Sequence, residues 1–359
     1  MKIKKLVKHA LVSVLAISLF MVAYYVVYLY CGYQRIANIE FPGVEKNSED
    51  VISANDTVSL MTYNIGFGAY SSDFSFFLDG GEHARAFSQE DVEKNVNGVI
   101  SVLSEYSPDI ITLQEVDLKG TRSYGVNQVE MIRSAFGGYS NGFAVNYDSP
   151  YYLYPLNEPI GKNKSGIMTL SKYKIEMYRR NSLPVEDGFE KYLDLDRCFT
   201  VSRIPVSNGK KLMVYNVHLS AYTKDGSLSD RQLEVLMESV RTEYNRGCYI
   251  IVFGDFNKDL LIDSGKYFER SDDEYNWAKP INSSLLPSYM SIVADTEIPS
   301  CRNANKAYSG DGTDFVITVD GALVSDNLEV VSVKTVDTGF EYSDHNPVYL
   351  EVKFISDHA

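Results

Sequence analysis

The segment Tyr249–Asn257 constrains the fold of this chain more than any other. Its first five residues are apolar and either aromatic or β-branched, which predicts a buried β-strand. Gly254 follows, where the backbone can turn, and Asp255 and Asn257 then project to the same side because they are two residues apart. An Asx turn that caps a loop is the simpler interpretation of such an ending. The pattern predicts a central strand with polar groups at its end.

The first 32 residues predict a membrane anchor. Four lysines precede the run Ala10–Cys31, which contains no acidic or basic residue and no histidine. As a helix this run would span roughly 33 Å, the thickness of a bilayer core. A cleaved signal peptide would be shorter and would end at a small-x-small site, which Tyr28–Cys31 does not offer. We therefore expect residues 1–9 in the cytoplasm, a transmembrane signal anchor over 10–32, and the rest outside the cytoplasm at the cell membrane.

The charge of the chain limits its partners. It has 34 basic and 48 acidic residues, a net charge of −14, and the first 32 residues contain no acid. An acidic exported part repels long polyanions and argues against a dedicated DNA-binding protein. A local basic strip that binds nucleic acid remains an alternative, and its candidate members are Arg122, Lys162, Lys164, Arg179 and Arg180.

The cysteines outside the anchor give no sign of a metal site or a disulfide framework. Cys198 and Cys248 lie in or beside apolar runs, and with Cys301 they make an odd number without a close pair. We expect free buried thiols.

The remaining chain predicts a linker over 33–56 and one catalytic domain over 57–359. Ser88 with Asp91, and Ser229 with Gln232, make two capping boxes that predict helix starts. Strands outnumber helices and do not alternate with them strictly, which favours mixed sheets with helices outside. The expected strands are 58–64, 110–116, 166–170, 198–206, 212–219, 249–253, 315–324, 328–336 and 347–354, and the expected helices begin near 89, 128 and 230.

Five of the predicted strand ends finish in polar residues. Together they supply oxygen ligands, two imidazoles and an Asp/Asn pair, the groups needed for Mg²⁺-assisted phosphoester hydrolysis. The five endings are Tyr63-Asn64, Gln114-Glu115, Asn216-Val217-His218, Asp255-Phe256-Asn257 and Ser343-Asp344-His345-Asn346.

With these motifs the sequence resembles the endonuclease/exonuclease/phosphatase superfamily, which is DNase I-like. The matching blocks cover roughly residues 58–354 and occur in the family's order. The resemblance implies an α/β (α+β) four-layer sandwich, in which two mixed β-sheets pack face to face with helices on both outer faces. It also implies an active site at one edge, where the strands end. The blocks are 61–65, 111–116, 165–172, 215–219, 254–257, 319–325 and 343–348.

The resemblance also implies a role for each matching residue. Glu115 would be the principal ligand of Mg²⁺, or of Mn²⁺, with Asn64 and Asp344 on or near the metal. His345 would contact the scissile phosphate and be oriented by Asp320, although Gly321 departs from the family pattern there. Asp255 would activate the attacking water and Asn257 would donate to a phosphate oxygen. Two further residues complete the set: Asn216, which would bind substrate, and His218, a general acid whose carboxylate partner stays open, with Glu158 as one candidate.

Three functions remain open at this stage. The favoured one is a membrane-anchored extracytoplasmic phosphoesterase that hydrolyses a lipid headgroup or a small phosphoester. The apolar loop Phe74–Leu78 next to Asn64 would then contact the bilayer, although packing under the sheet edge is an equal alternative. The others are a surface nuclease for extracellular nucleic acid and a catalytically silent binding domain. No protein partner is indicated.

Overall fold

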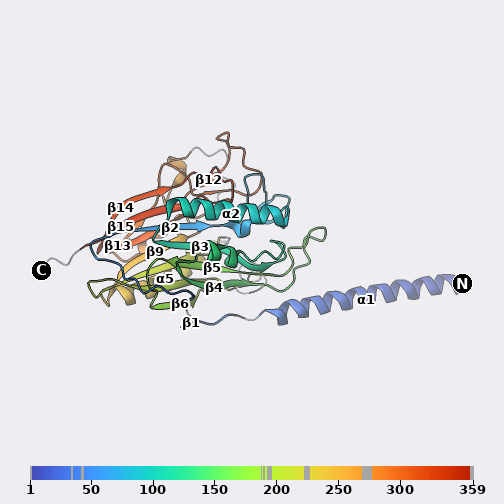
Figure 1. Ribbon diagram of the computed structural model, residues 1–359. Coiled ribbons are helices and arrows are strands. Elements are labelled where there is room, and N and C mark those ends of the chain that lie inside the picture. The colour runs from blue at the N-terminus through green and yellow to red at the C-terminus, as the bar shows by residue number, and fades with distance from the viewer. Residues whose placement is uncertain are drawn as a thin grey trace.

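Two mixed β-sheets pack face to face at the centre of the structure (Figure 1). This computed structural model describes residues 2–33, 35–41, 44–186, 188, 191, 196–221, 227–268 and 277–355. The seven-stranded sheet contains, in spatial order, β1 (Ile39–Phe41), β6 (Met177–Ser182), β7 (Cys198–Pro205), β8 (Lys211–His218), β9 (Tyr249–Asp255), β13 (Asp320–Ser325) and β10 (Met290–Val293). The six-stranded sheet contains β14 (Leu328–Thr335), β15 (Val348–Phe354), β2 (Thr57–Asn64), β3 (Ile110–Gly120), β5 (Asn163–Ser171) and β4 (Ser140–Asp148).

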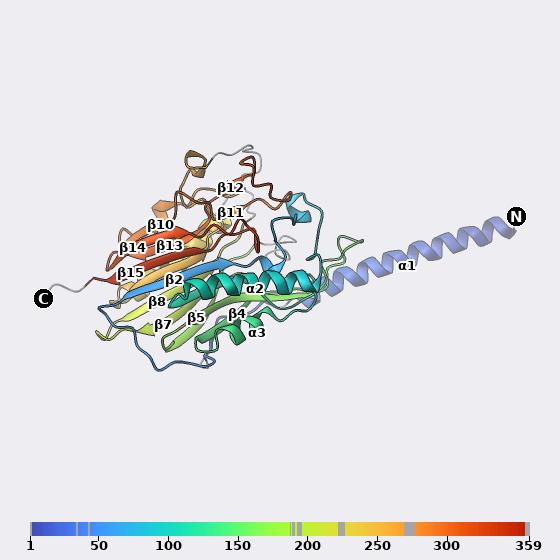
Figure 2. The ribbon, with the colours of Figure 1, turned by 45° about the horizontal axis from the view of Figure 1, so that its top comes forward.

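Helices cover both outer faces and complete the four layers. α2 (Gln89–Tyr106) and α3 (Gln128–Ala135) cover the six-stranded sheet (Figure 2), and α5 (Ser227–Tyr244) packs against the other. α1 (Lys2–Gly32) extends away from the domain. The short elements are the 3₁₀ helices η1 (Gly66–Gly68), η2 (Phe77–Asp79), η3 (Ser264–Lys266) and η5 (Ser283–Leu285), and the two-stranded pair β11 (Cys301–Arg302) and β12 (Val316–Ile317).

Strand β9 explains why its sequence is apolar without interruption. Ile251 and Phe253 face the core between the two sheets, whereas Ile250 and Val252 face α5. Both faces of the strand are therefore buried, and alternation with polar residues is lost. The predicted central strand is confirmed.

The structure corrects several sequence predictions. Ser229 does not cap a helix start, because the described part of α5 already begins at Ser227. The expected strand 315–324 divides into β12 and β13, and part of the expected linker 33–56 forms β1, which pairs with β6. In the apolar loop, Phe74 and Ser75 are buried and Phe76 packs against the core, so this part follows the packing alternative, whereas Leu78 is exposed.

Other predictions are confirmed. Ser88 accepts a hydrogen bond from the backbone of Asp91 and caps α2 as the capping box predicts. Cys198, Cys248 and Cys301 are free and buried.

Candidate active site

Strand register brings three of the predicted residues together. β8 and β9 are parallel and place His218 beside Asp255, while antiparallel β13 places Asp320 on the other side of Asp255. β2 ends at Asn64, which pairs with Gln114 in β3, and Glu115 follows Gln114 at a bulge where β3 continues to Gly120. The site therefore forms where strands of both sheets end.

Gly254 makes the close approach of β8 and β9 possible. A Cβ atom at this position would lie 2.3 Å from the carbonyl oxygen of Val217, and φ of Gly254 is +154°. No other residue fits there without moving the backbone. The glycine thereby sets the spacing between His218 and Asp255.

A buried carboxylate orients His345. Nδ1 of His345 lies 2.7 Å from Oδ2 of Asp320, and the hydroxyl of Ser300 donates to the same oxygen at 2.8 Å. Burial acts to lower the pKa of His345, but the charge and hydrogen bond of Asp320 outweigh it and raise that pKa well above its usual value. His345 is therefore protonated near neutral pH, with Nε2 left to face the site.

Asp255 lies at the centre of the site and is 1% exposed. Its Oδ2 accepts from the amide of Asn64 at 2.9 Å, and its Oδ1 accepts from the backbone of Asn257 at 2.8 Å. Burial, then the charge of Asp320, raises the pKa of Asp255 to about 7. The carboxyl group can therefore gain and lose a proton near neutral pH.

His218 is buried and faces two carboxylates. Its Nε2 lies 3.5 Å from Oδ2 of Asp255 and 3.8 Å from Oε1 of Glu115. Burial, then the charge of Arg197, lowers the pKa of His218 well below its usual value, so the ring is neutral. Glu158 is not its partner: Nε2 faces Asp255 and Glu115, and Nδ1 has no hydrogen-bond partner among the residues that the structure describes.

The three predicted metal ligands lie at the same edge. Oδ1 of Asn64 accepts from the backbone of Gly66, and Oδ1 of Asp344 is 3.2 Å from where a Cβ on Gly66 would lie. Glu115 has a strained φ of +54° at a bulge in β3, the kind of backbone strain that gathers at functional sites. Burial raises the pKa of both Glu115 and Asp344, and the charge of Asp344 raises that of Glu115 further.

This donor set fits a divalent cation. Glu115 and Asp344 are carboxylates whose mutual repulsion a cation would relieve, and oxygen ligands suit Mg²⁺ or Mn²⁺. A second group, Asp255, Asp320 and His345, has its ligand atoms within 4.8 Å of one another. Those atoms already bind one another or Asn64, so the first set fits the ion better.

Asn216 is fully buried and hydrogen-bonds to protein groups of the facing six-stranded sheet. Its amide donates to the carbonyl oxygens of Leu113 and Met168, and its oxygen accepts from Gln114 at 2.8 Å. It joins the two sheets behind the site. Asn257 is nearly buried, and its amide donates to the carbonyl oxygen of Leu219 at 2.8 Å.

Sequence reasoning missed several supporting residues. Ser300 orients Asp320, while Arg122 forms a buried ion pair with Asp117 at 2.8 Å and stacks on Phe67 with its carbon 3.7 Å from the ring centre. Ser300 carries no local signal, because its partner is 20 residues away.

The proposed basic strip does not form. Arg180 is buried and donates to backbone carbonyls, and Arg122 is held by Asp117. Lys162 and Lys164 share one surface, and Arg179 lines a different hollow.

Comparison with known proteins decides the family. The model described as the Endonuclease/Exonuclease/phosphatase family matches residues 61–358. The chain belongs to this family. Its members are nucleases and phosphatases, so the protein is a hydrolase that acts on phosphoester bonds.

Solved structures show the same fold in the endonuclease/exonuclease/phosphatase family. The member from Beutenbergia cavernae DSM 12333 is 15% identical with a TM-score of 0.58, covering 83% of this chain and 72% of that one. The Bacteroides vulgatus member is 15% identical with a TM-score of 0.53, covering 83% and 99%. D. rerio TDP2 complexed with single strand DNA product is 16% identical with a TM-score of 0.52, covering 83% and 100%. No curated protein sequence is matched.

The N-terminal helix agrees with a membrane anchor. Residues Ile3–Gly32 form one helix that is long and apolar enough to cross a membrane, with a mean hydropathy of 2.4 over its 18-residue apolar window.

Proposed function

We propose that this protein is a membrane-anchored, extracytoplasmic, Mg²⁺-dependent phosphoesterase whose preferred substrate is a lipid headgroup or a small phosphoester. One observation carries the chemistry: Asp255, with a pKa of about 7, lies between His218 and the buried Asp320–His345 pair. A carboxylate can accept a proton from the attacking water, and a cationic imidazole can stabilise the charge on the phosphoryl oxygens. Both effects speed phosphoester hydrolysis.

Asp255 and His345 have different roles in the proposed reaction. Asp255 takes a proton from the attacking water, because its raised pKa makes the carboxylate basic enough at neutral pH. His345 faces the phosphate through Nε2 and stabilises the charge that grows on its oxygens. Because its pKa is lowered, His218 is neutral and is a much weaker acid than a protonated imidazole. In place of a general acid, we assign it a hydrogen bond to the leaving oxygen.

Other residues hold the substrate and the metal. Glu115, Asn64 and Asp344 would bind Mg²⁺ or Mn²⁺, which when bound supplies positive charge to the phosphoryl group. Asn257 would orient a phosphate oxygen. Asn216 would contribute to substrate binding indirectly, because it holds together the strands that carry the site.

Two features support a lipid or small substrate over duplex DNA. The chain has a net charge of −14, and α1 would hold the domain beside a bilayer. A second candidate is a surface nuclease, which the TDP2 complex with single strand DNA and the surface shared by Lys162 and Lys164 favour.

Hydrolysis by the full chain separates these candidates. Phospholipid vesicles and plasmid DNA would be incubated with the protein in Mg²⁺, with Glu115→Ala as the inactive variant and the exposed Glu329→Ala as its matched control. The proposal is supported if the wild type and Glu329→Ala release the headgroup and Glu115→Ala does not. The nuclease would instead be supported if the wild type and Glu329→Ala nick DNA, Glu115→Ala does not, and the rate of nicking falls steeply as salt is added. Metal binding without hydrolysis of either would indicate a silent binding domain.

A further inference from the structure

The loop between β4 and β5, residues 149–162, exposes large apolar side chains. Leu156 is 85% exposed and Tyr154 is 68% exposed, and Leu153 is also exposed. The loop is nevertheless ordered, because Tyr152 and Gly161 exchange two backbone hydrogen bonds of 3.0 Å. Fixed apolar groups that face outward mark an interaction surface.

A second segment extends this surface. The ring of Phe77 lies 5.8 Å from that of Tyr154, centre to centre, and the adjacent Leu78 is 47% exposed. Of the predicted bilayer-contacting loop, Phe77 and Leu78 therefore remain at the surface and join the loop 149–162.

The same loop binds the domain-proximal end of α1. The hydroxyl of Tyr25 donates to the carbonyl oxygen of Tyr151 at 3.1 Å, and the backbone of Leu153 donates to that hydroxyl at 2.9 Å. The backbone of Tyr151 donates to the hydroxyl of Tyr28 at 3.0 Å. Tyr25 lies about 10 Å along the helix from its last residue, Gly32. A bilayer crossed by α1 would therefore have its outer interface at the level of this loop.

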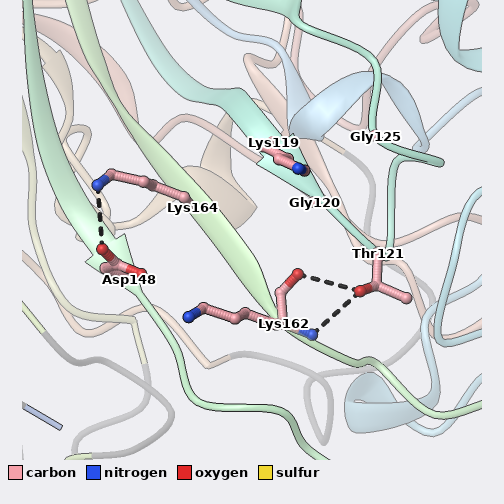
Figure 3. Close-up of a pocket in the computed structure, with 7 residues that line it drawn as sticks. All are labelled: Lys119, Gly120, Thr121, Gly125, Asp148, Lys162 and Lys164. Atoms are coloured by element: carbon pink, nitrogen blue, oxygen red, sulfur yellow. Dashed lines mark hydrogen bonds and ion pairs between the residues drawn. The ribbon is translucent and has the colours of Figure 1, made fainter. Parts of the chain in front are cut away.

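A basic hollow of about 520 Å³ adjoins the loop (Figure 3). It is lined by Lys119, Lys162 and Lys164, and the facing Asp148 pairs with Lys164 at 3.2 Å. Among the described residues, the structure gives no ion-pair partner to Lys119 or Lys162. In a chain with 48 acidic residues, this local positive charge beside apolar side chains suits the phosphates of anionic lipids.

The hollow and the active site lie at the same sheet edge. Glu115 and Gly120, which lines the hollow, are five residues apart on β3, about 17 Å of extended chain. A bilayer that touches the hollow would be within reach of the candidate catalytic groups.

We propose that loop 149–162, Leu78 and the basic hollow form a docking surface for the anionic outer leaflet of the membrane that α1 crosses. Leu153, Tyr154 and Leu156 enter the interface, and Lys119 and Lys162 bind lipid phosphates. Docking directs the candidate active site toward lipid headgroups. This inference rests on the proposed function, since it takes α1 as the membrane anchor.

Tryptophan quenching in the full chain tests the docking. Leu156→Trp would be compared with Val331→Trp, an exposed position on β14, in vesicles whose acyl chains are brominated. The vesicles would contain phosphatidylcholine alone or with phosphatidylglycerol, and native Trp277 gives both variants the same background. We expect quenching at position 156 that grows with phosphatidylglycerol, and none at 331.

The lysines are tested in the Leu156→Trp background. Lys119→Ser and Lys162→Ser should each lower the ratio of docked to undocked protein about 5-fold, whereas Lys353→Ser on the exposed face of β15 should not change it. Loss of oligonucleotide binding in the lysine variants with unchanged quenching would assign the hollow to nucleic acid and overturn the proposal.

Failure of docking is distinguishable from failure of the proposed function. Flotation of the full chain with vesicles reports on the anchor, and headgroup release lost in Glu115→Ala reports on the activity. Flotation and activity without quenching at position 156 would overturn the docking surface alone.

Discussion

His345 and Asp320 form a buried pair, with Nδ1 of the imidazole 2.7 Å from Oδ2 of the carboxylate. The hydroxyl of Ser300 donates to the same carboxylate oxygen and accepts hydrogen bonds from the backbone of Val319 and Asp320. The pair fixes the direction of the imidazole and stabilises its positive charge, as carboxylate partners of functional histidines do.

Asp320→Asn should lower turnover by about 10- to 100-fold, because the amide neither holds the charge nor orients His345 as the carboxylate does. The measurement is kcat/KM on a phosphoester. Asp56→Asn, at an exposed position, is the control and should match the wild type. Equal activity of Asp320→Asn and the wild type would show that the pair does not position a catalytic group.

The same variant should move the pH profile. The charge of Asp320 raises the pKa of Asp255 by more than the charge of His345 lowers it, so the pKa of Asp255 falls from about 7 in Asp320→Asn even when His345 loses its proton. A base must be deprotonated to act, and the acid limb of kcat/KM should therefore move to lower pH in Asp320→Asn. If the acid limb of kcat/KM stays in place or moves to higher pH in this variant, the assignment of Asp255 as the general base is contradicted.

Mg²⁺ should stabilise the folded protein through Glu115. At about 100 times its dissociation constant, a ligand that binds only the folded state adds about 2.7 kcal/mol to the free energy of unfolding. Glu115→Ala should lose most of this gain, which thermal or urea unfolding with and without Mg²⁺ measures. Glu329→Ala should keep it. The same gain in both variants would place the ion elsewhere.

Gly254→Ala should destabilise the protein by about 1–3 kcal/mol, because the added Cβ would lie 2.3 Å from the carbonyl oxygen of Val217. Gly138→Ala is the matched control, since nothing lies within 4 Å of a Cβ there. Urea unfolding measures both. A stable Gly254→Ala protein would mean that β8 and β9 can separate without cost.

The sequence predicted the central strands well for a physical reason. Strands buried on both faces, such as β9, have continuous apolar residues, and their polar endings stand out. Strands with mixed composition escaped prediction, as β4 did with its sequence Ser-Asn-Gly-Phe-Ala-Val-Asn-Tyr-Asp. The repeated apolar-to-polar endings also pointed to the edge where Asn64, His218 and Asp255 lie.

Long-range partners were not predictable from the sequence. Arg180 looks like a surface cation, but its guanidinium is buried against backbone carbonyls of Val145 and Asp196. Phe74 looks like part of an exposed loop, yet it is fully buried in a cluster that includes Val96 and Ile132. Such burial depends on segments far apart in the chain, which local patterns do not contain.

The most direct test of the account is hydrolysis of a phosphodiester by the full chain in Mg²⁺ and ¹⁸O-labelled water, comparing the wild type with Asp255→Asn. We predict that the wild type places ¹⁸O in the phosphate product and that Asp255→Asn is slower by about 10²- to 10⁴-fold. Equal rates in the two proteins, or a folded wild type that binds Mg²⁺ without hydrolysing any phosphoester, would contradict the assignment of this site as a phosphoesterase.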